Sequence, residues 1–231
     1  MNKSGAVREN RRDAVAATGP REDDRWRAAG LWGAGLAAGY AVLVRFYQAA
    51  GGEIGLSGTM KEEFAAGFGM ASYAAGLLIL LAGLACLVLT RPALRRVPRR
   101  SPVAAGGAVS PWILGPLCLA PVVAGGAYAV SHAISGTITK GMDLVNPGTV
   151  NYPDVWANLD RTSVALWDIF LYEPWFLAMG VCLLLSAWRY LRDHGASDAL
   201  LRRLALGCVV VVVGLAAFSV WLTVMDMTVI V

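Results

Sequence analysis

Four ionisable side chains in or beside long apolar stretches are the residues that could do chemistry: Arg45, His132, Asp168 and Glu173. A charge in hydrocarbon is costly, so such a residue commonly marks a binding or proton-transfer site. We expect Arg45 to be the counter-charge of Asp168 or Glu173. Together with His132, these residues would line a small polar pocket at the outer membrane face, near Asp226 of the last apolar stretch. The pocket is expected to bind a ligand, with no catalytic residue and no metal ligand assigned.

The motifs that would make this pocket catalytic are absent from the sequence. A lone histidine such as His132 is more often a satisfied interfacial residue than a general base. There is no His-Glu-x-x-His, Gly-x-Ser-x-Gly or paired-cysteine signature, and no cofactor is expected. The cysteines have no close partner in sequence and are predicted to be small buried hydrophobic residues in separate apolar stretches: Cys86, Cys118, Cys182 and Cys208.

Five long apolar runs must position these side chains. With 57% hydrophobic and 16% charged residues, the chain is too apolar for an ordinary soluble domain. About 20 residues in a helix rising about 1.5 Å per residue cross the hydrocarbon of a bilayer. We predict an all-α multipass transmembrane helical bundle with spans at about 26–48, 65–90, 112–134, 174–191 and 204–226.

The basic residues indicate how the bundle is oriented. Lys and Arg number seven in the N-terminal segment, five between the second and third spans and four between the fourth and fifth, and they are scarce in the alternate connections. This pattern follows topology rather than nucleic-acid binding, and it predicts a cytoplasmic N-terminus and an outer C-terminus in a cell (inner) membrane. Residues 1–25 are predicted to be a disordered cytoplasmic tail and 26–231 a single membrane domain. Cleavage of the first span as a signal near Ala49 is left open.

The loops between spans carry ordinary turn chemistry. The glycine-rich stretch 51–58 lacks the spacing of a phosphate-binding loop, and a tight turn is the better interpretation. Residues 135–161 are predicted to form an outer loop in which Asp143, Asp154 and Asp160 are solvated, because no calcium-loop pattern is present.

The start of the fourth span decides how deep Glu173 lies. A helix beginning near Ser163 would place Glu173 about 15 Å along it, close to mid-membrane. Alternatively the crossing begins at Pro174, because proline suits a first helical turn and aromatic residues then fall at both interfaces. Aromatic placement favours the second alternative, with 163–173 as an interfacial segment. All ionisable candidates would then lie near the outer face.

Three stretches of the sequence carry a resemblance: Arg45-Phe-Tyr-Gln-Ala-Ala-Gly-Gly-Glu-Ile-Gly-Leu, Arg91-Pro-Ala-Leu-Arg-Arg-Val-Pro and Tyr172-Glu-Pro-Trp. Together they resemble an uncharacterised family of actinobacterial integral membrane proteins with four to five spans and no known function. The resemblance implies a small bacterial inner-membrane bundle. It carries over no functional residues.

The function that requires least beyond these features is that of a non-enzymatic accessory or structural subunit with an outward-facing polar surface. Its partners would be the lipid bilayer and a second membrane protein, with no nucleic acid. A small-solute transporter or binder using the outer polar pocket is the first alternative, and a membrane-embedded enzyme is the second.

Overall fold

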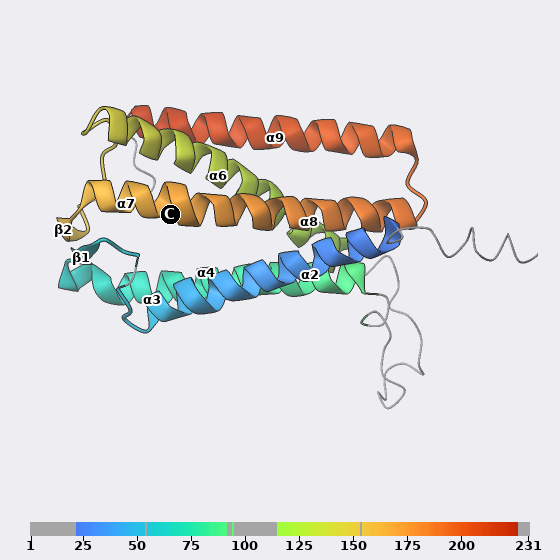
Figure 1. Cartoon of the computed structure of the whole chain (residues 1–231), viewed down its shortest axis with the longest axis horizontal. Coiled ribbons are helices and arrows are strands. Elements are labelled where there is room, and N and C mark those ends of the chain that lie inside the picture. Colours follow the sequence, from blue (N-terminus) through green and yellow to red (C-terminus); the bar gives the residue numbers. More distant parts are fainter. Residues whose placement is uncertain (1–21, 54, 92–93, 95–114, 153, 226–231) are drawn as a thin grey trace, which may run out of the picture.

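The computed structural model of the chain describes residues 22–53, 55–91, 94, 115–152 and 154–225. Five long helices make up most of this part (Figure 1). In chain order they are α2 (Glu22–Tyr40) continued by η1 (Ala41–Phe46) and α3 (Tyr47–Ala49); α4 (Glu62–Thr90); η3 (Gly115–Leu119) continued by α6 (Ala120–Val145); α7 (Arg161–Trp167), η4 (Asp168–Tyr172) and α8 (Glu173–Asp193); and α9 (Asp198–Val224). The η segments are single π-helical stretches within longer helices.

All five helices are long and apolar enough to cross a membrane, which confirms the predicted all-α bundle and the multipass class. The candidate spans are Ala28–Ala49, Glu62–Thr90, Leu117–Val145, Arg161–Asp193 and Asp198–Val224. Helical structure begins at Glu22, so residues 22–25 of the predicted tail are helical. The rest of that tail and Asp226 lie outside the described residues.

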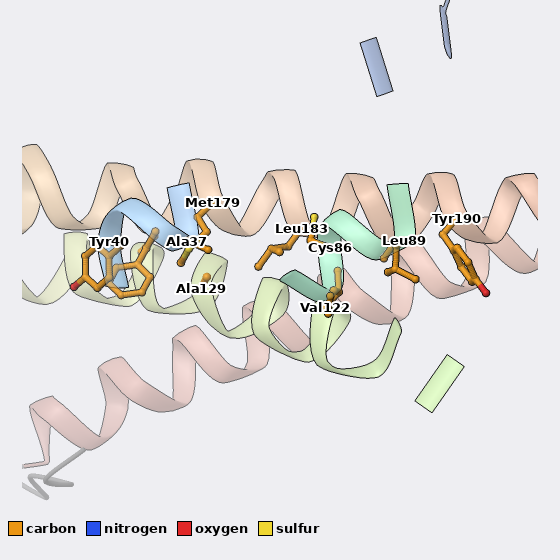
Figure 2. Packing of buried hydrophobic residues seen from close by; sticks show 13 residues of the cluster. Ala37, Tyr40, Cys86, Leu89, Val122, Ala129, Met179, Leu183 and Tyr190 are labelled. Atoms are coloured by element: carbon orange, nitrogen blue, oxygen red, sulfur yellow. The ribbon is translucent and has the colours of Figure 1, made fainter. Parts of the chain in front are cut away.

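Four helices form the core and the fifth lies on its flank. α2 packs on α4 and α8, and α6 packs on α8, while α9 lies along α6 (Figure 1). The buried side chains between them include Cys86, Leu89 and Leu183 (Figure 2). α6 and α8 approach closely where two glycines meet: a Cβ on Gly180 would lie 2.9 Å from the carbonyl oxygen of Gly126. Small residues permit such close backbone contact where lipid supplies no hydrophobic drive.

The third helix continues to Val145, whereas the sequence predicted its end near residue 134 and a loop from 135. Polar side chains lowered the hydropathy of this segment, but they recur every three or four residues. That spacing gathers them on one helix face, where a neighbouring helix shields them from lipid. Lys140 and Asp143 therefore belong to the helix, and His132 lies near its middle.

The fourth helix runs without a break from Arg161 to Asp193, so the predicted interfacial segment 163–173 and the predicted span 174–191 form one continuous helix. Asp160 caps its start by accepting a hydrogen bond from the Ser163 backbone N–H at 3.0 Å. Proline within a helix removes a donor and clashes with the preceding turn. Here the π-helical turn η4 ends at Tyr172, two residues before Pro174. Such local changes in helical hydrogen bonding accommodate proline within membrane helices.

Two short strands tie the connections together at one end of the bundle. β1 (Gly58–Met60) pairs antiparallel with β2 (Trp156–Leu159), and Lys61 forms an ion pair with Asp154 at 2.7 Å. Figure 1 shows both strands at the end where α3, α4 and α7 meet. We call this end of the bundle the β end.

Candidate functional site

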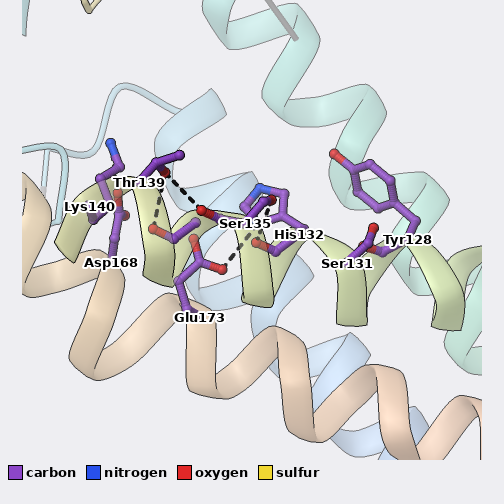
Figure 3. A network of polar contacts seen from close by, with 9 residues as sticks. Tyr128, Ser131, His132, Ser135, Thr139, Lys140, Asp168 and Glu173 are labelled. Carbon is purple, nitrogen blue, oxygen red and sulfur yellow. Dashed lines mark hydrogen bonds and ion pairs between the residues drawn. The ribbon is translucent and has the colours of Figure 1, made fainter. Parts of the chain in front are cut away.

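A polar stripe runs along α6 from its middle to the β end, on the side facing η4 and α8 (Figure 3). Its members follow one another at spacings of one, three or four residues, which keeps them on one broad helix face: Ser131, His132, Ser135, Thr139, Lys140 and Asp143. The three hydroxyls donate to carbonyl oxygens of their own helix at 2.9 to 3.2 Å. The ionisable members therefore carry the contacts to other elements.

His132 and Glu173 meet between α6 and α8. Nδ1 of His132 lies 3.1 Å from Oε2 of Glu173, whose side chain is only 3% exposed. The carboxylate fits because Gly136 has no side chain: a Cβ there would lie 1.8 Å from Oε1 of Glu173. Phe176 stacks on the His132 ring with centroids 4.7 Å apart. His132 and the space left by Gly136 thus hold the Glu173 carboxylate, which lies about 18 Å along the helix from Arg161.

Lys140 and Asp168 meet closer to the β end. Their Nζ and Oδ2 atoms lie 3.2 Å apart, and both side chains are mostly buried. Lys140 also donates a hydrogen bond to the Tyr152 hydroxyl at 3.2 Å. Asp168 belongs to η4, so the π-helical turn presents its carboxylate to α6.

Asp143 organises the connection that leaves α6. Its Oδ1 atom accepts hydrogen bonds from the backbone N–H groups of Gly148 at 3.1 Å and Val150 at 3.3 Å. Arg161 lies 3.4 Å from the same carboxylate and also donates to the Val150 carbonyl. The carboxylate is buried, contrary to the predicted solvated acid, because a turn of backbone closes around it.

Tyr152 lies between two cations of the β end. The Lys140 Nζ lies 4.4 Å and the Arg161 Cζ 5.0 Å from its ring centroid. Burial raises the pKa of the Tyr152 hydroxyl above its ordinary value, and the neighbouring Lys140 offsets part of that rise. The neutral phenol is therefore the favoured form in the folded protein.

Arg45 does not pair with either predicted acid, so its expected role as their counter-charge is wrong. Lys140 holds Asp168 and His132 holds Glu173. Arg45 instead lies over the Tyr40 ring, 5.7 Å from its centroid. Its position on η1, with Cβ directed at α4, explains the difference.

The structure brings His132 and Glu173 together, and it places Arg45 apart from Asp168 and Glu173. Sequence reasoning missed Lys140 and Asp143, although their spacing from His132 along a helix was the available signal. Among the described residues there is no group of three or more acids, histidines or cysteines that could hold a metal ion. Chemically, this arrangement can fix helix packing, because Glu173, Asp168 and Asp143 each have a cationic or hydrogen-bonding partner.

The helices and this site define a multipass membrane protein with ionisable pairs inside its bundle. No protein-family model matches the sequence, and no curated protein or solved structure matches it. Proposals about its function therefore rest on the residues of this chain.

Proposed function

We propose that this protein is a non-enzymatic accessory or structural subunit of a bacterial inner-membrane complex, and that α9 docks a transmembrane helix of its partner. The observation that carries this proposal is the attachment of α9 along one side only. It packs on α6 and has few contacts with α8. Only 11% of its most apolar segment is buried inside the structure, against 28 to 33% of the corresponding segments of the other spans.

The groove beside α9 supports a transmembrane helix as the part of the partner that docks there. A groove of about 450 Å³ follows the junction of α6 and α9. The residues that line it are all of apolar type, and two are alanines: Ile134, Ile138, Val213, Ala216, Ala217, Val220, Trp221 and Val224. Small residues at a helix surface let a second helix approach closely, and close packing drives helix association in lipid.

The ion pairs between the polar stripe and the fourth helix support a non-enzymatic role. Glu173, Asp168 and Asp143 are each engaged by a side chain of this chain. Groups engaged in this way position helices, whereas an acid–base catalyst needs access to a substrate proton. The distribution of Lys and Arg favours an orientation in which the β end lies outside the cytoplasm.

The test places a large side chain in the groove and measures whether the partner still co-purifies. Ala217→Phe places a large side chain in the groove at an exposed position. Leu215→Phe introduces the same side chain on the same helix at a position that does not line the groove. We expect a stoichiometric partner to co-purify in mild detergent with the natural chain and with Leu215→Phe, and to be lost with Ala217→Phe at equal membrane abundance.

A photocrosslinking residue locates the contact. Placed at Val210 of α9, which is 63% exposed, it should capture that same partner. Placed at Leu78 of α4, which is 69% exposed, it should capture only lipid. A chain that purifies without a partner, and crosslinks only to lipid from both positions, would contradict the accessory role.

A further inference from the structure

Arg45 is a cation without a polar partner among the described residues. Its Nε atom is buried and makes no hydrogen bond, and its guanidinium lies over the face of Tyr40, with Cζ 5.7 Å from the ring centroid. Arginine stays charged in proteins and carries five N–H donors, so it cannot shed its charge to relieve burial. Arg45 as a whole is half-buried, and its buried Nε–H lacks the acceptor that a buried donor requires.

Two further orphaned polar atoms belong to the same helix junction. Gln48 is 7% exposed and Ser72 is 2% exposed, and neither Oε1 of Gln48 nor Oγ of Ser72 has a hydrogen-bond partner. Buried side-chain polar atoms are nearly always paired in native proteins. Finding three such atoms in one junction indicates a site whose partner is a molecule other than this chain.

The packing of α4 against η1 and α3 places these groups together. A Cβ on Gly76 would lie 3.1 Å from Cβ of Arg45, and a Cβ on Gly69 would lie 3.4 Å from the Ala49 carbonyl oxygen. Ser72 lies between these two glycines on the same face of α4. It therefore faces the stretch of the first helix that carries Arg45 and Gln48.

The connection between α3 and β1 contacts the fourth helix at Tyr172. Gly55 has φ +82, and a Cβ on it would lie 1.8 Å from the Tyr172 hydroxyl. Tyr172 in turn contacts the Tyr40 ring edge-on, with centroids 6.1 Å apart. The Tyr172 and Tyr40 rings thus connect a turn whose positive φ favours glycine to the Arg45 cation.

The chemistry of the orphaned groups defines the missing partner. The Arg45 Nε–H and the Ser72 hydroxyl are donors, and the Gln48 amide offers a donor or an acceptor according to its rotation. The nearby acids Asp168 and Glu173 are already engaged by α6. The junction therefore has a cation and unused donors without acceptors in this chain, and a group with several acceptor oxygens and a negative charge satisfies both.

We propose that Arg45, Gln48 and Ser72 form a binding site at the β end for an oxyanion group of the carboxylate or phosphate type. The group belongs either to a free small anion or to the headgroup of an anionic lipid. The site is separate from the α9 groove and does not depend on a partner protein. Failure of either proposal leaves the other standing.

The test measures the thermal unfolding midpoint of the full chain in phosphatidylcholine nanodiscs. One arm adds inorganic phosphate, another adds acetate, and both are compared with chloride at matched ionic strength. A third arm replaces part of the phosphatidylcholine with phosphatidylglycerol. A ligand that binds only the folded state raises the midpoint in proportion to its occupancy. We expect a rise with at least one free anion if the source is soluble, and with phosphatidylglycerol alone if it is a lipid.

Three variants distinguish anion binding by Arg45 and Ser72 from a structural role of these side chains. Arg45→Met should abolish the rise while leaving the midpoint without ligand equal or higher, because methionine removes a buried N–H donor that has no acceptor. Ser72→Ala should reduce the rise without lowering that midpoint, since the hydroxyl makes no bond to lose. Arg202→Met removes an exposed arginine of α9 and should keep the full rise.

Two results overturn the proposal. One is the absence of any rise in all three arms for the natural chain. The other is a rise that persists in full in Arg45→Met, because the stabilising anion then binds elsewhere. A lower midpoint of unliganded Arg45→Met together with no rise in the natural chain would make Arg45 a packing residue.

Discussion

Nδ1 of His132 lies 3.1 Å from Oε2 of Glu173, and this contact joins α6 to α8 inside the bundle. Closer to the β end, Lys140 contacts Asp168 and Arg161 contacts Asp143. The three contacts form a series along α6, and each connects it to a different segment of the fourth helix. A series of this kind fixes both the register and the rotation of two helices, which apolar packing in lipid specifies weakly.

The first prediction concerns the space that Gly136 leaves for the Glu173 carboxylate. Gly136→Ala should destabilise the bundle by about 1–3 kcal/mol, because the added methyl displaces a carboxylate held in a packed interior. Denaturant unfolding in mixed micelles measures the change. Gly125→Ala is the matched control on the same helix, since its added Cβ meets the nearest atom at an ordinary 3.6 Å.

A double-mutant cycle shows whether the carboxylate is the cause. In a Glu173→Ala background the space is empty, so Gly136→Ala should cost much less, with a coupling energy of about 0.5–3 kcal/mol. Additive effects of the two substitutions would place the strain elsewhere on α6.

The second prediction compares a buried acid with an exposed one at the β end. Asp143→Ala leaves two backbone N–H groups and the Arg161 guanidinium without their acceptor, and we expect a loss of about 3–5 kcal/mol. Asp154→Ala removes an ion pair whose acid is 95% exposed, and its effect should be small. Thermal unfolding gives the comparison, and limited proteolysis of the 146–160 connection should accelerate in Asp143→Ala alone. Equal effects would mean that Asp143 does not organise this connection.

The third prediction concerns orientation. In a background with all four cysteines replaced by alanine, Asp154→Cys should react with a membrane-impermeant maleimide in intact cells. Arg202 is exposed in the first turns of α9, and α9 begins at the end of the bundle opposite β1 and β2 (Figure 1), so Arg202→Cys should react only after permeabilisation. This outcome follows from the excess of basic residues in the segments at that end. The reverse pattern of labelling would invert the topology.

Hydropathy predicted the five helices because the length and apolarity of a span are local properties of the sequence. It ended the third helix too early, since Ser135, Thr139 and Lys140 are polar and only a facing helix explains their burial. The four-residue spacing of His132, Gly136 and Lys140 encoded that face. A search for polar periodicity beyond the end of the apolar run would have extended the helix.

Which side chains pair within the site could not be predicted from the sequence, for a different reason. The choice of Lys140 rather than Arg45 as the partner of Asp168 depends on how three helices rotate against one another. The position of Glu173 depended on whether Pro174 begins a helix or is accommodated by a π-helical turn, and both are compatible with proline chemistry. Such outcomes are set by tertiary packing, whereas spacing along one helix is set by sequence.

The last prediction is a pH dependence arising from Tyr152. Burial raises the pKa of its hydroxyl, so the folded state holds the phenolic proton more tightly than the unfolded state. Its contribution is constant below about pH 10, where the phenol is protonated in both states, and is lost as the pH rises through the folded-state pKa. Tyr152→Phe should lower stability by about 1 kcal/mol at neutral pH, because the hydrogen bond from Lys140 is lost. Above about pH 10 the unfolding midpoint of the natural chain should fall toward that of Tyr152→Phe, and a constant difference across this range would show that the phenol titrates equally in both states.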